Sequence, residues 1–186
     1  MFLAGGRVSL RPIEEADLDF LHKHINDARV WRSLAESLPR NRDQEREWFE
    51  AVVCDDESVH LLVTPDSTPV GTVGLDPVDW ADGSVELGYW VAPDYQGQGY
   101  GTEAVELVVG YAFDQLGLRR LSARVIAFNE PSVRLLERVG FVREGTRRET
   151  AFVDGEYHDT HWYGLLEAEW RERSSGGGDA GEGETA

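Results

Sequence analysis

Short apolar segments recur along most of the chain, separated by Gly, Pro and Asp residues. Residues 8–11 alternate between apolar and polar and stop at Pro12, as expected for a first strand. Leu18, Leu21 and Ile25 have helical spacing within a helix expected over 14–25. The same criteria predict strands over 59–64, 70–80, 85–91 and 121–126, from 141 onward and over 158–166, and helices over 42–53, 102–116 and 131–139. Strands come first in succession and then alternate with helices, which predicts a mixed α/β sheet.

Chain length and composition predict one domain followed by a tail. A length of 186 residues with 41% hydrophobic residues suits a single folded domain with its own core. We place this domain at residues 1–173, because residues 174–186 (SSGGGDAGEGETA) have the acidic, Gly/Ser-rich composition of a disordered tail. Inside the domain, a polar, Arg-bearing stretch at 29–42 separates two expected helices, and we expect it to cover a substrate groove.

Charge and composition exclude several classes of protein. Asp and Glu total 35 against 18 Lys and Arg, a formal net charge of −17, so the surface repels nucleic acid and anionic membranes. The chain has no apolar run of membrane-spanning length and no signal-peptide layout at its start. Cys54 is the only cysteine, so neither an intrachain disulfide nor a Cys-rich metal site is expected. These features predict a soluble protein of the cytoplasm.

The acidic excess has two interpretations. Lys23 is the only lysine among the 18 basic residues, and an acidic, lysine-poor composition resembles that of proteins from salt-accumulating halophiles. A GC-rich genome also replaces Lys by Arg, but it leaves the excess of acid unexplained. We therefore favour the halophilic interpretation.

A glycine-rich turn at residues 96–102 (QGQGYGT) joins an apolar strand to a helix. A helix N-terminus carries unpaired backbone N–H groups and the positive end of the helix dipole. Glycine lets the backbone approach a bulky anion and adopt a positive φ. The turn can therefore surround a pyrophosphate with the N–H groups of Gln98, Gly99, Tyr100, Gly101 and Thr102.

Three other interpretations of this turn compete. A dinucleotide-binding turn needs G-x-G-x-x-G in a first βαβ unit, whereas G-x-G-x-G stands here past the middle of the chain. A Walker loop needs Gly-Lys-Ser/Thr, and the turn has no lysine. A glycine turn with a purely structural role stays open.

With this turn the chain resembles the GNAT superfamily of acetyltransferases. The central signature, Gln/Arg-x-x-Gly-x-Gly/Ala, is matched by Gln96, Gly99 and Gly101, after a strand at 86–91 that is also similar. A second signature, Asn-x-x-Ser with a downstream Gly-Phe, is matched by Asn129, Ser132, Gly140 and Phe141. The segments at 10–12 and 157–163 look most like the RimJ/RimL type, the ribosomal-protein N-terminal acetyltransferases. The resemblance covers roughly residues 7–170.

The resemblance implies a fold, a co-substrate and a reaction. The sheet would splay open between its fourth and fifth strands, at 85–91 and 121–126, with acetyl-coenzyme A in the opening. A backbone N–H near Trp90 or Val91 would hold the thioester carbonyl. The implied cofactor-binding residues are Trp90, Val91, Gln96, Gly97, Gln98, Gly99, Tyr100, Gly101, Thr102, Asn129, Ser132 and Arg134.

Two side chains are predicted to be catalytic. Glu86 stands in an otherwise apolar strand, where a carboxylate partly removed from water suits a general base, although pairing with an arginine or facing solvent is the alternative. Ser132 holds the position that the RimJ/RimL type uses near the sulfur, as a possible proton donor. Asn129 would bond to the pantetheine arm. The alternative for Asn129 and Ser132 is capping of the following helix, which does not preclude ligand binding.

Other polar residues fit the chemistry less closely. Arg134 and Arg138 share a helix face and either meet the 3′-phosphate of coenzyme A or balance neighbouring glutamates. A glutamate implicated in the RimL-type mechanism aligns with Ala151, and the nearby Glu149 faces the same way only if the register holds. His158 and His161 lie in the last expected strand, and either could act as a base, although polar strand residues are the more usual interpretation. Their spacing is not metal-like and no third ligand is apparent, so no metal is expected. Cys54 lies far from the motifs, which disfavours a covalent acetyl-cysteine.

The predicted function is transfer of an acetyl group from acetyl-coenzyme A to a primary amine in a ternary complex. A peptide or protein N-terminus is the favoured acceptor. The alternatives are a small amine, such as an antibiotic, polyamine or amino acid, and a module that senses acyl-coenzyme A without turnover. The sequence does not reveal the oligomeric state.

Overall fold

A computed structural model describes residues 1–176 of the chain. Its strands are β1 (Leu3–Ala4), β2 (Ser9–Pro12), β3 (Val59–Thr64), β4 (Gly71–Asp79), β5 (Ser84–Val91), β6 (Arg120–Ile126), β7 (Val142–Val153) and β8 (Glu156–Leu166). Its longer helices are α1 (Leu18–Ile25), α2 (Ala28–Leu34), α3 (Arg42–Trp48), α4 (Tyr100–Asp114), α5 (Glu130–Val139) and α6 (Glu167–Gly176). A π-helical segment, Phe49–Val53, extends α3, and the remaining helical pieces are single 3₁₀ turns.

The strands form one mixed sheet in the order β1-β2-β3-β4-β5-β6-β8-β7. Every neighbouring pair is antiparallel except β5 and β6, which run parallel because α4 connects them. The mixed α/β class predicted from the sequence is therefore confirmed. The strand expected over 85–91 is the fifth rather than the fourth, because the two-residue strand β1 precedes the one that ends at Pro12.

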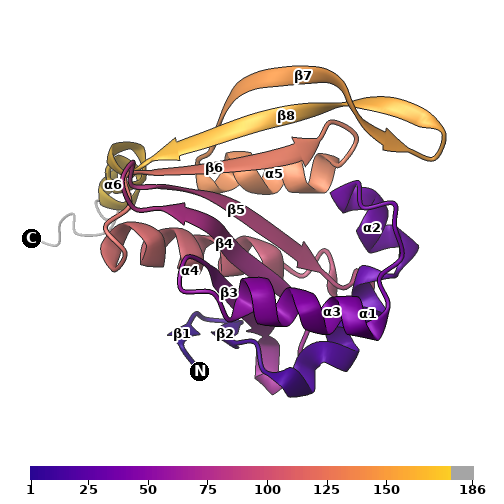
Figure 1. Cartoon of the computed structure of the whole chain (residues 1–186). Helices are drawn as coiled ribbons and strands as arrows, with labels where there is room; N and C mark the ends of the chain where they lie inside the picture. The colour runs from indigo at the N-terminus through magenta and orange to yellow at the C-terminus, as the bar shows by residue number, and fades with distance from the viewer. Residues whose placement is uncertain (177–186) are drawn as a thin grey trace, which may run out of the picture.

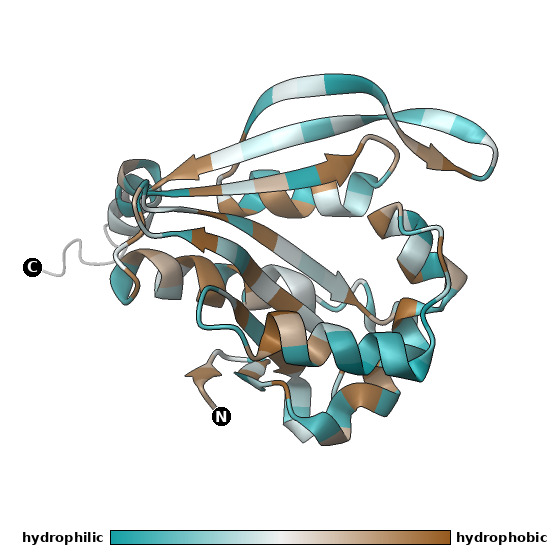
Figure 2. Cartoon of the chain, in the orientation of Figure 1, coloured by the Kyte–Doolittle hydropathy of each residue, from teal (hydrophilic) through white to brown (hydrophobic). Residues whose placement is uncertain are grey.

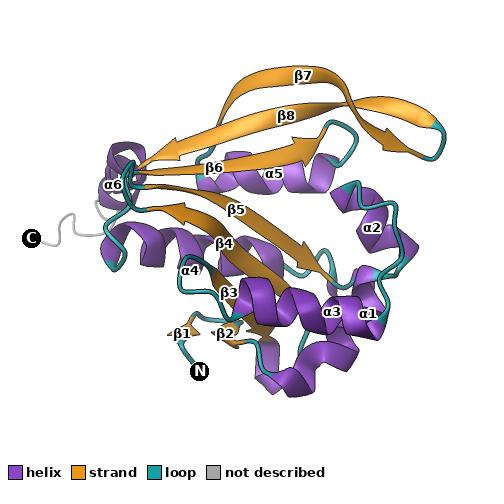
Figure 3. Ribbon diagram, viewed as in Figure 1, coloured by secondary structure: helices purple, strands orange, loops and turns teal. Residues whose placement is uncertain are grey.

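Helices cover both faces of the sheet (Figures 1 and 3). On one face, α4 and α5 cover the larger core, to which alternate residues such as Leu61 and Val63 of β3 contribute. On the other face, Leu62 packs with Leu21 of α1 in a smaller cluster that α3 completes through Trp48. This alternation follows from the two-residue period of a strand. In Figure 2, brown bands recur along β4, β5 and β6, whereas most of β7 is teal or white.

Two helices were not expected from the sequence. Within the polar stretch 29–42, α2 is capped by Asp27, whose side chain accepts the Arg29 N–H, and it ends at Ala35 with a φ of 55°. At the other end of the chain, α6 continues to Gly176, so the first three residues of the predicted tail are helical. The disorder predicted for the rest of the tail, 177–186, falls outside the described residues.

Candidate active site

Strands β5 and β6 pair over only part of their length. The parallel pairing runs from Ser84 opposite Arg120 to Leu87 opposite Ala123 and goes no further. Beyond this point β5 stays with β4 and β6 stays with β8, so the two halves of the sheet diverge (Figure 1). A cavity of about 1020 Å³ occupies the opening. The splayed sheet that the resemblance implied is thus present.

The edge of β5 that faces this opening offers backbone groups that no strand uses. Ala92 donates its N–H to the Val70 carbonyl at 2.7 Å, on the β4 side. Successive N–H groups along a strand point in opposite directions. The N–H groups of Tyr89 and Val91 therefore point into the opening, and that of Trp90 points toward β4. Of the two positions predicted for the carbonyl-binding N–H, the backbone direction favours Val91.

The glycine-rich turn lies at one end of the cavity. Gly97 and Gly99 have φ values of 74° and 83°, which side chains disfavour. Gly99 is the N-cap of α4 and has no side chain to bond to the first N–H groups of that helix. These groups are thus available to an anion. The predicted turn residues that line the cavity are Gln96, Gly97, Gly99, Tyr100, Gly101 and Thr102.

Gln98 is the predicted turn residue that does not line the cavity. Its carbonyl accepts a hydrogen bond from Arg7 Nη1 at 3.3 Å. Arg7 also forms an ion pair of 3.0 Å with Glu103 of α4, whose carboxylate accepts the backbone N–H groups of Arg7 and Val8 as well. The N-terminal segment is thereby fastened to the turn. Nothing in the sequence pattern indicated this contact, because it joins residues far apart in the chain.

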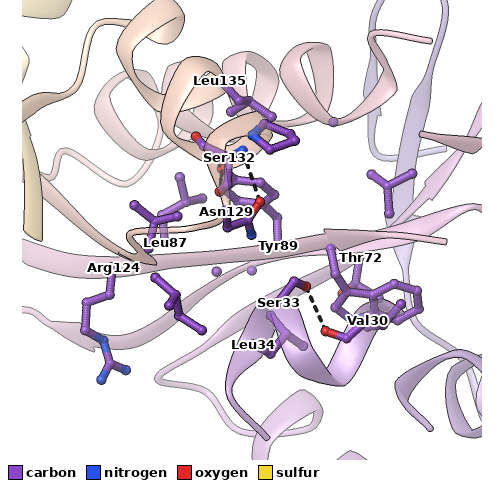
Figure 4. A pocket seen from close by; sticks show the side chains of 18 of the residues that line it. Val30, Ser33, Leu34, Thr72, Leu87, Tyr89, Arg124, Asn129, Ser132 and Leu135 are labelled. Atoms are coloured by element: carbon purple, nitrogen blue, oxygen red, sulfur yellow. Dashed lines mark hydrogen bonds between the residues drawn. The ribbon is translucent and has the colours of Figure 1, made fainter. Parts of the chain in front are cut away.

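Tyr89 and Ser132 meet across the opening. Ser132 Oγ lies 2.6 Å from Tyr89 Oη, and the Ser132 N–H donates to Asn129 Oδ1 at 3.3 Å, so Asn129 caps α5 (Figure 4). Burial raises the pKa of Tyr89 to about 12, and the bond to Ser132 opposes that shift. The pair therefore presents two protonated hydroxyls at neutral pH. Sequence reasoning missed Tyr89, because strand alternation gave no sign that its hydroxyl reaches Ser132 of α5.

Glu86 is paired with an arginine, the alternative left open by the sequence. Its Oε1 accepts a hydrogen bond from Arg124 Nε at 2.6 Å, and 30% of its side chain is exposed. Arg124 in turn lies over the ring of Trp162, with 5.4 Å from Cζ to the ring centroid. Both Glu86 and Arg124 line the cavity. The Glu86 carboxylate is thus engaged by a guanidinium at the cavity wall, and its role as the base stays a prediction.

The far end of the cavity is enclosed by segments distant in sequence. Val30, Ser33 and Leu34 of α2 lie opposite the Ser132 cluster (Figure 4). An ion pair of 2.9 Å between Arg32 and Asp154 ties α2 to the turn of the β7–β8 hairpin. The expectation that the stretch 29–42 would border a groove agrees with this arrangement. Trp48, His60, Thr72, Gly74 and Asp76 complete this end.

The basic residues of α5 lie at the edge of the cavity. Arg134 forms an exposed ion pair of 2.9 Å with Glu130, one turn earlier. Arg138 lines the same cavity and has no ion pair within residues 1–176. Both interpretations of these arginines thus keep support, since Arg134 balances a glutamate and both side chains border the opening.

The remaining polar candidates lie outside the cavity. His161 Nδ1 is 2.9 Å from Thr146 Oγ1, and His158 packs edge-on against Phe128. Glu149 is exposed and does not line the cavity, so it does not replace the carboxylate missing at Ala151. Ala151 itself is buried in a small apolar cluster. Cys54 is exposed. Within residues 1–176, no group of three or more His, Cys, Asp or Glu side chains could hold a metal ion.

Comparisons with known proteins agree with this geometry. The family model for the acetyltransferase (GNAT) domain matches residues 7–142. "Putative ribosomal N-acetyltransferase YdaF" of Bacillus subtilis is 31% identical over 171 residues, covering 88% of this chain and 93% of that protein. Spermidine N(1)-acetyltransferase of Escherichia coli K12 is 28% identical, covering 82% of each chain.

A solved structure has the same fold. The spermidine N-acetyltransferase of Vibrio cholerae, in complex with CoA and spermine, superposes with a TM-score of 0.84 at 26% identity, covering 89% of this chain and 98% of that one. No helix among residues 1–176 is long and apolar enough to cross a membrane. The splayed sheet, the glycine turn and these relatives together establish that the chain belongs to the GNAT family and is an N-acetyltransferase that uses acetyl-coenzyme A.

Proposed function

We propose that this acetyltransferase acts on the N-terminal amine of a peptide or protein, by direct transfer in a ternary complex. The observation that carries the acceptor class is the charge balance of the cavity. Its carboxylates are Glu36, Asp76 and Glu86, whereas its guanidinium groups are Arg29, Arg40, Arg124, Arg134 and Arg138. An acceptor with one ammonium group suits such a wall better than one with several, because repeated cations require an excess of carboxylates.

Ion pairs reduce the charge on both sides of this balance. Glu36 is paired with Arg40 at 2.8 Å and Glu86 with Arg124 at 2.6 Å, which leaves Asp76 as the remaining carboxylate. Arg29 is paired with Asp27 and Arg134 with Glu130, which leaves Arg138 as the remaining guanidinium of the described lining, so that lining has no excess of carboxylates. Asp76 is exposed. The similarity to a relative named for ribosomal N-acetylation supports the same acceptor class. We also infer that the chain belongs to the RimJ/RimL-type branch, on the segments at 10–12 and 157–163.

A polyamine is the second candidate acceptor. The specific observation in its favour is that relatives from Escherichia coli and Vibrio cholerae are named spermidine N(1)-acetyltransferases, and that a structural neighbour holds spermine. The charge balance of the cavity opposes this candidate, whereas the similarity to those relatives supports it.

In this proposal, different groups bind acetyl-coenzyme A and assist the transfer of its acetyl group. The first turn of α4 would hold the pyrophosphate, Asn129 the pantetheine arm and Arg134 the 3′-phosphate. The Val91 N–H would stabilise charge on the thioester oxygen. Ser132, with Tyr89 behind it, would supply the proton that the leaving thiolate takes up. Cys54 lies outside the cavity lining, which supports transfer without an acetyl-enzyme.

The experiment that tests the acceptor is a competition between two kinds of amine. Peptides with free N-termini and their N-terminally blocked counterparts are incubated with acetyl-coenzyme A, beside spermidine and an aminoglycoside. We expect acetylation of free N-termini and no reaction of the blocked peptides. Turnover of spermidine or the aminoglycoside without any turnover of peptides would contradict the proposal.

We further infer that the acidic surface is an adaptation to high salt and that the protein works in the cytoplasm. The excess of 35 acidic over 18 basic residues supports the first inference. The use of acetyl-coenzyme A, a co-substrate made inside cells, supports the second.

A further inference from the structure

A row of three residues crosses the sheet beside the point where it splays. His60 of β3 lies opposite Gly74 of β4, and Gly74 lies opposite Gly88 of β5. Residues directly opposite each other share one face of a sheet. Gly88 is the first residue of β5 beyond the last pair with β6, at Leu87. The row thus runs across the sheet from the opening at β5 to β3, where Trp48 of α3 packs against His60. All three residues of the row line the cavity.

The two glycines have different surroundings. A Cβ atom built on Gly88 would meet no atom within 4 Å, so the space above it is open. A Cβ atom built on Gly74 would lie 2.6 Å from His60 Nδ1 and 2.9 Å from its Cε1. The Nδ1–Cε1 edge of the imidazole therefore lies over Gly74. Neither glycine has a positive φ, so backbone strain does not explain them.

The two ring nitrogens of His60 also differ. Nε2 is closed off from solvent and has no hydrogen-bond partner within residues 1–176. Nδ1 has no hydrogen-bond partner among these residues either, but it is not closed off from solvent. Trp48 of α3 packs edge-on against the ring at 5.5 Å between centroids and holds its orientation. A histidine fixed in this way, with one nitrogen turned into a cavity, has no structural hydrogen bond to account for it.

The surroundings keep the His60 imidazole uncharged. Burial lowers the pKa of His60, and the Asp76 carboxylate of β4 opposes that shift. The other charged groups on this part of the wall are Glu86 and Arg124, which are paired with each other, and α3 contributes the uncharged Trp48. An uncharged imidazole at neutral pH can accept a proton.

We propose that His60 is the general base that removes the proton from the acceptor amine, and that the amine reaches the thioester over Gly88. Neighbouring strands lie about 4.8 Å apart, so a nitrogen above Gly88 is roughly 5 Å from the edge of the ring over Gly74. That distance is bridged by a small shift of the amine or by one water molecule. The free N–H groups of Tyr89 and Val91 lie along the same stretch of β5.

The proton and the bonds balance in this arrangement. The amine nitrogen attacks the thioester carbon, the C–N bond forms and the C–S bond breaks. The ammonium form of the acceptor first loses one proton to His60 Nδ1, which passes it to solvent, and the nitrogen loses a second proton to solvent as the amide forms. Ser132 gives its proton to the thiolate and takes one back from solvent, so the net products are the amide, the free thiol and one proton. The inference requires only acetyl transfer to an amine and not the peptide acceptor proposed above. Spermidine therefore serves as acceptor if peptides are not turned over.

The test is the pH dependence of kcat/KM for His60→Gln, with His161→Gln as the matched control outside the cavity. We expect His60→Gln to lose about 100-fold at pH 7, within the usual range for a missing general base. The loss shrinks as the pH approaches the pKa of the amine, because solvent then supplies the free amine. His161→Gln keeps the wild-type profile. A loss equal at every pH would indicate a structural role and overturn the assignment, as would loss of the acidic limb in Glu86→Gln alone.

Two measurements keep the inference testable if His60→Gln does not fold. Gly88→Val fills open space, so it should preserve the melting temperature and the Kd for acetyl-coenzyme A while abolishing turnover. In the wild type, an NMR titration of the histidine rings should find His60 unprotonated at Nδ1 at pH 7. Full turnover by Gly88→Val, or a proton on Nδ1 at pH 7, would overturn the proposal.

Discussion

The two ends of the cavity are lined by different kinds of chemical group, backbone N–H groups at one end and side chains at the other. At the end proposed for the cofactor, the groups available for recognition are backbone N–H groups of β5 and of the first turn of α4, within one continuous segment, 89–102. At the acceptor end, they are side chains from α2, α3, β3 and β6, brought together from positions as far apart as Arg29 and Arg124. An ion pair between Arg32 and Asp154 helps to enclose this second end.

This difference explains why one substrate can be named and the other only proposed. A backbone site needs glycines at fixed positions, because only glycine tolerates positive φ and close approach of a bulky anion. Such a requirement leaves a pattern in one sequence. A side-chain site assembled from distant segments can change its specificity by single substitutions and leaves no fixed spacing. The predictions below test this division between the two ends.

The largest effect is expected at the glycine turn. Gly99→Val places a branched side chain at a φ of 83° and against Arg7, at the point where the pyrophosphate would bind. We expect the Kd for acetyl-coenzyme A to rise by about 100-fold or more. Gly117→Val, at a φ of 66° with open space around it, is the matched control for backbone strain. Calorimetry that finds equal affinities in the two variants would place the cofactor elsewhere.

The next effect concerns the hydroxyl pair at the boundary between the two ends. We expect Ser132→Ala to lower kcat by about 10–100-fold with little change in KM, since the proton donor acts only in the reaction. Tyr89→Phe removes the partner of Ser132 and should lower kcat by a smaller factor. Tyr163→Phe is the control, because its hydroxyl bonds to Glu137 away from the cavity. Steady-state kinetics in which KM alone changes would contradict a role in proton transfer.

A smaller effect is expected at the acceptor end. Arg32→Gln breaks the ion pair with Asp154, and both partners are about half exposed, so the free energy of unfolding should change by less than about 1 kcal/mol. Because α2 is then held less firmly against the β7–β8 turn, the KM of the acceptor should rise by a few-fold, whereas the Kd of acetyl-coenzyme A should not change. Asp154→Asn should reproduce the effect, and the double variant should add little. Independent, additive effects would show that the contact does not cover the acceptor.

Much of the fold followed from the sequence because its elements obey simple periods. The strands at 59–64 and 121–126 and the helix at 131–139 were predicted to within a residue or two. The helix expected at 102–116 begins earlier, at Tyr100, because Gly99 caps it with a left-handed conformation. Helix α2 was missed because its seven residues are too few to show a clear helical period, and they lie in a stretch that is otherwise polar.

The candidate site was less predictable at its acceptor end. The turn at 96–101 could be found because its glycines have a fixed spacing. His60 could not, since its meaning depends on lying opposite Gly74 and under Trp48, two contacts between separate elements. For Glu86 the sequence left pairing with an arginine open, but it could not name the partner, because Arg124 lies 38 positions away.

The last prediction uses salt to separate the two ends. The chain carries a formal net charge of −17, so the folded state repels itself and also repels the polyanionic coenzyme A. Molar KCl shortens the screening length to about 3 Å, which removes most of this long-range repulsion. Hydrogen bonds from the first turn of α4 act at contact distance and persist. We therefore expect the melting temperature to rise by several degrees and the affinity for acetyl-coenzyme A to increase a few-fold between low and molar KCl.

The acceptor end should respond differently to the same change. Salt screens its exposed ion pairs, which are Arg32 with Asp154 and Arg29 with Asp94. These pairs then lose their small contribution to the stability of the acceptor end. The KM of the acceptor should therefore stay constant or rise while the Kd of acetyl-coenzyme A falls. Thermal melts and binding measurements at both salt concentrations, with steady-state kinetics beside them, test this contrast. Full stability at low salt with cofactor affinity that falls as KCl is added would mean that the basic side chains of α5 dominate cofactor binding, and that the acidic surface is no adaptation to salt.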